Sequence, residues 1–125
     1  MRSSIIEKKT TLSFETVCQL IRINIASNGF LILNEINTQK IVAQQGIVIP
    51  KLIQILFFHP RYIKIILEND PLAINEVPIK IVIHEIKDCN TSVSFTNPEM
   101  SFIDYNSLEK LALELLNKIN IITEL

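Results

Sequence analysis

The sequence predicts an α+β fold in which an antiparallel β-sheet carries two long helices on one face. Three features support this prediction. The stretches 14–25 and 108–119 repeat apolar residues with the 3.6-residue period of an amphipathic helix. The stretches 79–86 and 91–97 have the two-residue alternation of strands with one buried face. The stretch 51–58 is apolar on both faces, as expected of a strand inside a sheet.

The N-terminal part is expected to form two strands, a long helix and a short helix. A strand is predicted at about 3–11, and Ser13 then caps a long helix that Gly29 ends. A second strand follows at 30–36, and a short helix at about 38–45. The buried stripe predicted for the long helix is Phe14, Val17, Cys18, Ile21 and Ile25. The strand 30–36 is expected to place Phe30, Ile32 and Ile36 on one face and Leu31, Leu33 and Glu35 on the other.

The stretch 51–71 predicts a strand, a corner, a short helix and a stop at Pro71. Because 51–58 has apolar residues on both faces, we expect a central strand that is covered on both sides. Its two faces are predicted to be Ile53, Ile55 and Phe57 on one side and Leu56 and Phe58 on the other. Pro60 fits the first turn of a helix at 61–68, which places His59 at the N-cap. This helix is expected to bury Ile63, Ile66 and Leu67.

The C-terminal part predicts a hairpin and a final helix. The strands 79–86 and 91–97 flank a turn at 87–90, and the face of Ser92, Ser94 and Thr96 is wholly polar. Asn106 and Glu109 form a capping-box-like start for the last helix. The predicted order is therefore strand, helix, four strands, helix. The apolar stripe predicted for the last helix is Leu108, Leu111, Ala112, Leu115, Leu116 and Ile119.

Length and composition exclude several classes of protein. With 125 residues, residues 1–125 are expected to form one domain. The net charge of −1, without a basic run longer than two lysines, makes a nucleic-acid partner unexpected. No apolar run approaches the ~20 residues of a membrane span. Cys18 and Cys89 are not in a CxxC motif and follow no signal peptide, so we expect a cytoplasmic protein with free thiols.

The corner at His59 is the strongest candidate for a ligand site. It lies at a helix N-terminus, where anions are favoured, and Arg61 follows it. Glu35 could complete a site with these two residues. The alternative is that His59 only caps the helix, and the sequence favours this role.

Other ionisable residues give weaker signals. His84 is expected on the solvent face of its strand, and Glu35 and Glu85 could form a carboxylate pair for acid/base chemistry. No spacing of His, Cys or carboxylates matches a metal motif, so neither a metal nor another cofactor is expected. Cys18 is interpreted as a core residue, and Cys89 lies in an acidic turn that disfavours the thiolate.

A homodimer is predicted from apolar residues that the chain would otherwise leave uncovered. Ile23 lies about 180° from the centre of the stripe of its helix, and Leu56 and Phe58 form the second face of strand 51–58. A second subunit could cover these residues. A loop of the same chain over the sheet is the alternative for the latter two, and ordinary surface exposure is the alternative for Ile23.

Three short motifs resemble a known family. The run ILFFHPRY ends at Tyr62, LENDP ends at Pro71 and EVPIK ends at Lys80. With Glu35, Gly46 and the pair Asn97-Pro98, they resemble the bacterial and archaeal domain of unknown function 302, over about residues 10–100. The resemblance implies a β-α-β4-α fold similar to that of the TATA-binding protein, and a tendency to form homodimers. It carries over no activity, because the family has none that is settled.

One position departs from the pattern of that family. Many members have Cys-Asn-Pro where this chain has Phe58-His59-Pro60. A redox or haem-related role of that cysteine would therefore not be shared by this chain. The sequence thus favours a non-catalytic homodimeric module that binds a small ligand or a partner protein. The alternative is a small enzyme or ligand sensor at the His59 corner.

Overall fold

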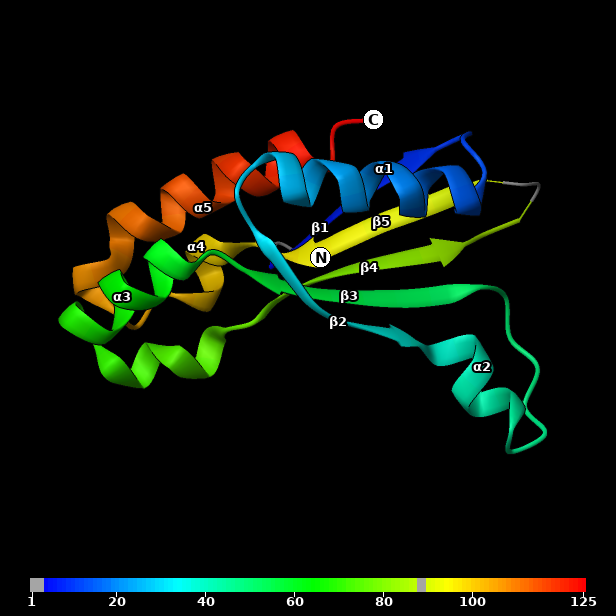
Figure 1. Ribbon diagram of the computed structural model, residues 1–125, viewed down its shortest axis with the longest axis horizontal. Helices are drawn as coiled ribbons and strands as arrows, with labels where there is room; N and C mark the ends of the chain where they lie inside the picture. Colours follow the sequence, from blue (N-terminus) through cyan, green and yellow to red (C-terminus); the bar gives the residue numbers. More distant parts are fainter. Residues whose placement is uncertain (1–3, 88–89) are drawn as a thin grey trace.

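The computed structural model describes residues 4–87 and 90–125. The elements are β1 (Ile5–Thr10), α1 (Phe14–Ser27), β2 (Leu31–Asn37), α2 (Thr38–Ala43), β3 (Leu52–Phe58), α3 (Pro60–Asn69), η1 (Pro71–Glu76), β4 (Ile79–Glu85), β5 (Thr91–Thr96), α4 (Pro98–Ser101), η2 (Asn106–Leu108) and α5 (Glu109–Ile122). The strands form one antiparallel sheet in the order β1-β5-β4-β3-β2. This confirms the α+β class. In Figure 1, α1 and α5 lie on the same side of the sheet, and α2 lies on the other side beyond the ends of β2 and β3.

The long helix α1 begins and ends as its sequence predicts. The Ser13 hydroxyl accepts a hydrogen bond from the Thr16 amide at 3.2 Å, and Gly29 follows the helix with a φ of +83°. The stripe Val17, Cys18, Ile21 and Ile25 is buried against the sheet. Each fully buried isoleucine stabilises the fold by about 1.5–3 kcal/mol relative to an exposed one.

The strand β3 lies inside the sheet, and its two faces are covered unequally. Ile53, Ile55 and Phe57 are buried, whereas Leu56 and Phe58 are only half-buried. β3 lies between β2 and β4, as a central strand is expected to, but its second face is covered only in part. Apolar residues on two faces indicated an interior strand correctly, but they did not show that this chain covers both faces.

The edge strand β2 differs from its predicted alternation. The register with β3 shifts between Ile32 and Asn34, so that Leu33 is the extra residue of a β-bulge. Phe30 precedes the strand and is buried. Because a bulge reverses the alternation, Glu35 lies on the helix-covered face opposite Ile55, whereas the simple alternation had placed it on the other side.

Three predictions about the corner helix and the C-terminal elements differ from the structure. The helix α3 buries Tyr62 and Ile66, while Leu67 is 50% exposed. The α-helical part of α5 begins only at Glu109, after the 3₁₀ turn η2, so the predicted capping start at Asn106 is not formed. The short elements η1 and α4 were not predicted, because 3₁₀ turns and single helical turns have no apolar period. Residues 88–89 of the predicted turn lie outside the described residues.

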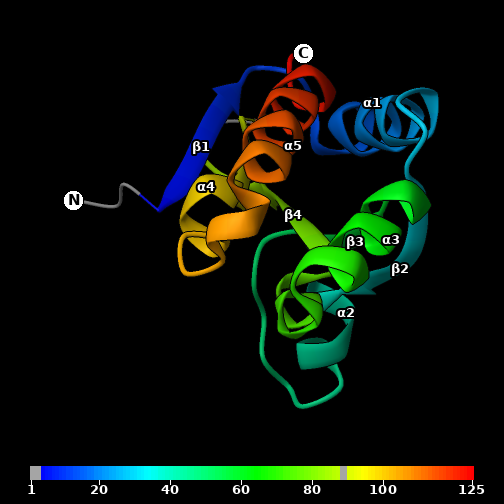
Figure 2. The same ribbon diagram turned by 90° about the vertical axis from the view of Figure 1, so that its left-hand side faces the viewer.

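The core lies between the sheet and the layer of α1 and α5 (Figure 2). The strands β4 and β5 contribute Ile81, Ile83, Val93 and Phe95 to it, as their alternation predicts. The stripe of α5 is also confirmed, with Leu116 only partly buried. Within 4–87 and 90–125, no helix has the length and apolar character needed to cross a membrane.

Candidate functional site

The corner between β3 and α3 places His59 at the N-cap, as predicted. Its Nδ1 atom accepts a hydrogen bond from the Arg61 amide at 3.1 Å. This bond requires a neutral imidazole with its proton on Nε2. The ring packs between Phe30 and Tyr62, with centroid distances of 5.3 and 5.0 Å. The capping role of His59 is therefore confirmed, and aromatic contacts hold the ring in place.

Two features disfavour a charged His59. Burial is the main cause that lowers its pKa, and the positive charges of Arg61 and Lys118 lower the pKa further. The carboxylate of Glu114 acts in the opposite direction but does not outweigh them. Gly29 packs directly against the ring, because a Cβ atom at this position would lie 3.0 Å from Nε2. Gly29 and Phe30, which follow α1, and Tyr62 of α3 therefore pack around the His59 ring.

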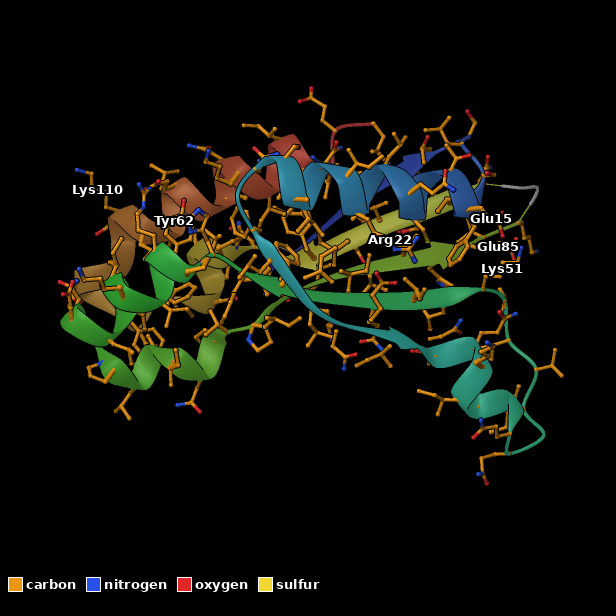
Figure 3. All side chains as sticks on the ribbon, viewed as in Figure 1. Glu15, Arg22, Lys51, Tyr62, Glu85 and Lys110 are labelled. Atoms are coloured by element: carbon orange, nitrogen blue, oxygen red, sulfur yellow. The ribbon has the colours of Figure 1, made fainter. Side chains whose placement is uncertain are left out.

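Glu114 of α5 connects this corner to the C-terminal helix. Its Oε1 atom accepts hydrogen bonds from Nη2 of Arg61 at 3.1 Å and from the Tyr62 hydroxyl at 3.0 Å. Figure 3 shows Tyr62 between α3 and α5. Burial and this bond raise the pKa of Tyr62 to about 12, so that its hydroxyl remains a donor at neutral pH. The polar groups of the corner thus bind one another and hold α3 against α5.

Glu35 is not part of this corner. Both of its carboxylate oxygens accept hydrogen bonds from Arg22 of α1, each at 2.8 Å. It lies opposite Ile55, and Ile55 and Phe58 are separated by roughly 10 Å along the strand. Among the surface hollows of residues 4–87 and 90–125 are four of about 250–390 Å³, and none of these is lined by His59, Arg61 or Glu35. The structure therefore brings together His59 and Arg61 but not the three predicted residues.

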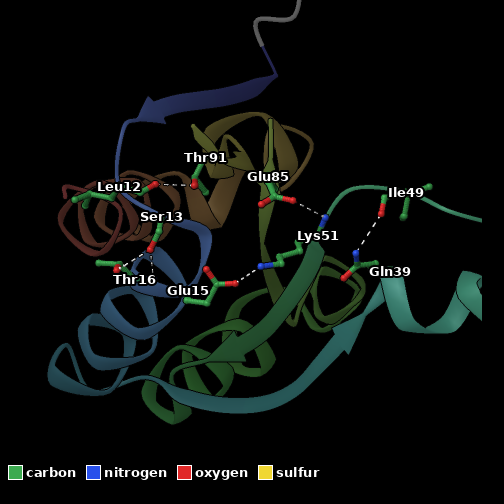
Figure 4. A network of polar contacts seen from close by, with 9 residues as sticks. All are labelled: Leu12, Ser13, Glu15, Thr16, Gln39, Ile49, Lys51, Glu85 and Thr91. Carbon is green, nitrogen blue, oxygen red and sulfur yellow. Dashed lines mark hydrogen bonds and ion pairs between the residues drawn. The ribbon is translucent and has the colours of Figure 1, made fainter. Parts of the chain in front are cut away.

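The second carboxylate of the proposed acid/base pair also has a separate partner. Glu85 accepts a hydrogen bond from the backbone amide of Lys51 at 3.4 Å, and the Lys51 ammonium pairs with Glu15 (Figure 4). Glu35 and Glu85 therefore do not form a carboxylate pair. The bond of Glu35 to Arg22 connects β2 to α1. The bonds of Lys51 to Glu85 and Glu15 connect the start of β3 to β4 and to α1.

The described thiol and the two histidines lie apart from one another in separate surroundings. Burial raises the pKa of Cys18 to about 11, which makes the thiol unreactive and agrees with its predicted place in the core. Cys89 lies outside the described residues. His84 is half-buried on the face of the sheet that no helix layer covers, opposite Leu52 and Ser92. In the part of the chain that the structure describes, no three His, Cys, Asp or Glu side chains are grouped to hold a metal ion.

The side of the sheet opposite α1 and α5 carries an apolar patch. Leu31 of β2 is 51% exposed and lies directly opposite Phe58, and Leu56 is the next residue of β3 on the same face. We call Leu31, Leu56 and Phe58 the open-face patch. The helix α2 reaches this face only farther along β3, where Gln54 donates a hydrogen bond to the Thr38 hydroxyl at 2.9 Å. The sequence did not single out Leu31, because its position depends on the strand register.

The predicted interface residues do not share one surface. Ile23 is 61% exposed on the side of α1 that points away from the sheet. Leu56 and Phe58 lie on the opposite side of the sheet. A single flat contact therefore cannot include all three residues. Of the predicted set, Leu56 and Phe58 belong to the open-face patch.

Acidification is expected to destabilise the wild-type protein more than its His59→Asn variant. Folding lowers the pKa of His59 below its usual 6.5, so the folded state favours the neutral ring. The resulting contribution to the free energy of unfolding is complete above pH 6.5 and is lost as the pH falls through the lower, folded-state pKa. Protonation also removes the acceptor of the Arg61 amide, whereas asparagine caps at every pH. Urea unfolding of both proteins between about pH 8 and pH 5 measures the difference. If the free energies of unfolding of the two proteins change equally with pH, the neutral, capping form of His59 assigned here is wrong.

Comparisons with known proteins agree on one family. The model of the family described as Domain of unknown function DUF302 matches residues 6–125. Among solved structures, an uncharacterized conserved DUF302 protein from Bacillus stearothermophilus is similar, with a TM-score of 0.89 and 12% sequence identity. The similarity covers 98% of this chain and 97% of that chain. At this identity the likeness concerns the fold. The comparison with curated proteins gave no match.

Proposed function

This chain belongs to the DUF302 family, and on this premise we propose that it is a non-catalytic homodimeric module that binds a partner through the open-face patch. The observation that supports the proposal is the apolar surface that Leu31 exposes next to the partly exposed Leu56 and Phe58. Adjacent apolar side chains that remain accessible on a sheet face are typical of an interaction site. The partner is expected to be a protein segment or a small molecule with an apolar surface.

The positions of the ionisable residues favour binding over catalysis. His59, Arg61, Tyr62 and Glu114 bind one another, and Glu35 binds Arg22. An acid/base or nucleophilic mechanism needs such groups to converge on a shared cavity. A site of His59, Arg61 and Glu35 therefore has less support than the open-face patch.

Two further properties belong to the same proposal. We infer a cytoplasmic location from the free thiol of Cys18. We also infer a fold related to that of the TATA-binding protein from the order of the long elements. Such a relationship does not carry over DNA binding, because the net charge of −1 provides no basic surface.

The Phe58→Asp variant is expected to lose a partner that the wild-type protein retains. A carboxylate in the middle of the patch would have to be desolvated on binding, which costs several kcal/mol. Native mass spectrometry of protein purified from lysate of its host measures the retained mass. Leu31→Asp changes the same patch at a more exposed position, and should have the same effect.

Ile23→Asp is the matched control, because Ile23 is also exposed but lies on the opposite side of the molecule. It should retain the partner. Circular dichroism of each variant verifies that it is folded. A partner that Phe58→Asp and Leu31→Asp retain, or a wild-type protein without any bound mass, would refute binding through this patch.

A further inference from the structure

We propose that the outer edge of β1 pairs with β1 of a second copy of this chain, in a register that Glu7 and Lys9 select. This interface presupposes the homodimer of the proposed function and states which surface forms it. Among the residues that the structure describes, β1 is an edge strand and pairs with β5 alone. Figure 2 shows β1 at the margin of the molecule, beside α5 and away from α1. Its outer backbone groups can therefore accept another strand.

The backbone hydrogen bonds show which residues of β1 face outward. The Asn97 amide donates to the Ser4 carbonyl at 2.7 Å, so Ser4 forms a hydrogen-bonded pair with β5. In an antiparallel ladder such pairs alternate, and the even-numbered residues of β1 therefore direct their N–H and C=O groups toward β5. Ile5, Glu7 and Lys9 direct theirs outward. They are the residues that can bond to a new strand.

The side-chain charges then select one register. Two copies related by a two-fold axis perpendicular to the sheet place residues of the same face opposite each other, so odd-numbered residues meet odd-numbered ones. One such register sets Glu7 opposite Lys9 of the partner subunit, twice because of the symmetry. The two neighbouring registers set Glu7 opposite the partner's Glu7, or Lys9 opposite the partner's Lys9. Like charges directly opposite each other are unfavourable, so only the first register is complementary.

The contacts that Glu7 already makes agree with this pairing. Its Oε2 atom accepts a hydrogen bond from the Ser92 hydroxyl at 2.6 Å, which holds the carboxylate on the sheet face opposite α5. Lys9 pairs with the same Ser92 in the strand register and therefore lies on this face as well. Both side chains are exposed. The ion pairs would thus form on one common surface.

In this register Lys8 would lie on the symmetry axis, opposite the partner's Lys8, but its ammonium group already binds to the end of α5 in its own chain. Its Nζ atom donates to the Thr123 hydroxyl at 2.8 Å and to the Asn120 carbonyl at 3.3 Å, at the C-terminal end of α5 of its own chain. The partial negative charge of a helix C-terminus favours this position. The repulsion between the two Lys8 residues is therefore reduced by contacts that already exist in the single chain.

The two edges of the sheet, β1 and β2, differ in how well they can pair with a strand of another subunit. Lysines on an edge strand generally prevent pairing with other strands, unless the new strand carries an acid at the matching position. The partner's Glu7 supplies this acid. The other edge, β2, contains the bulge between Ile32 and Asn34, which interrupts regular pairing. In the proposed dimer both open-face patches would point to the same side, because the two-fold axis is perpendicular to the sheet.

Charge reversal provides the test. Sedimentation over a concentration series should show a dimer for the wild type, and dissociation constants raised by about tenfold or more for Glu7→Lys and for Lys9→Glu. An equimolar mixture of these two variants should form a mixed dimer, because each Lys then meets a Glu. The double variant Glu7→Lys/Lys9→Glu should dimerise again. Native mass spectrometry distinguishes the mixed dimer by mass.

Glu68→Lys and Lys110→Glu are the matched controls, since both residues are exposed and lie on α3 and α5 (Figure 3 labels Lys110). They should dimerise like the wild type. A wild-type dimer that neither single variant weakens, or two weakened variants whose mixture stays monomeric, would overturn the edge interface and leave the homodimer standing. A wild type that stays monomeric at every concentration would overturn both. Binding through the open-face patch is tested separately by Phe58→Asp.

Discussion

Phe57→Ala is expected to lower the free energy of unfolding by about 3–5 kcal/mol. Phe57 is fully buried and contacts Phe30 edge to face, with ring centroids 5.4 Å apart. It lies opposite Ile32 and Ile79 on the helix-covered face of the sheet. Truncation would remove this packing and leave a cavity between the sheet and the helices. Urea unfolding monitored by circular dichroism measures the loss.

The adjacent Phe58→Ala variant is the control for this prediction. Phe58 has the same side chain but lies on the open face, where it is only half-buried. We expect it to cost only about 1 kcal/mol, because Phe58 is partly exposed and its truncation leaves no enclosed cavity. Equal losses for the two variants would show that the second face of β3 is covered, and would remove the basis of the open-face patch.

Gly29→Ala is expected to lower the free energy of unfolding by about 1–3 kcal/mol. Two costs combine at this position. Its φ of +83° is strained for any residue with a Cβ atom, and the new methyl group would lie 3.0 Å from Nε2 of His59. The ring has little room to move, because Phe30 and Tyr62 flank it and its Nδ1 atom caps α3. Thermal or urea unfolding would measure the change.

Gly46→Ala separates these two costs. Gly46 has a similar φ of +76°, but a Cβ atom there would have no other atom within 4 Å. It should therefore show only the backbone cost, and less destabilisation than Gly29→Ala. In a His59→Ala background, the additional cost of Gly29→Ala should disappear. Equal effects of the two glycine variants in the wild-type background would contradict the packing of His59 against the end of α1.

Together the predictions separate a structural corner from an interaction surface. His59 and Gly29 are expected to affect stability and its pH dependence, because their contacts lie within the chain. Phe58 and Leu31 are expected to affect binding, and Glu7 and Lys9 to affect assembly, because their side chains extend from the sheet toward solvent. Each group of variants has its own measurement.

The local elements could be predicted from the sequence, because their signals are local. The apolar periods of α1 and α5 and the alternation of β4 and β5 depend on residues a few positions apart. Ser13 and His59 cap helices that begin immediately after them. The interior position of β3 was also predictable, since both of its faces are apolar. These features together established the α+β class.

The partners across the sheet were decided only by the tertiary structure. Glu35 bonds to Arg22 because the bulge in β2 turns it to the helix-covered face, and its position opposite Ile55 separates it from the His59 corner. Leu31 lies beside Phe58, and Ile23 lies on the opposite side of the molecule, because of the strand order and the side on which α1 packs. Strand order and register arise from contacts between residues distant in the chain. A period of two or 3.6 residues contains no information about those contacts.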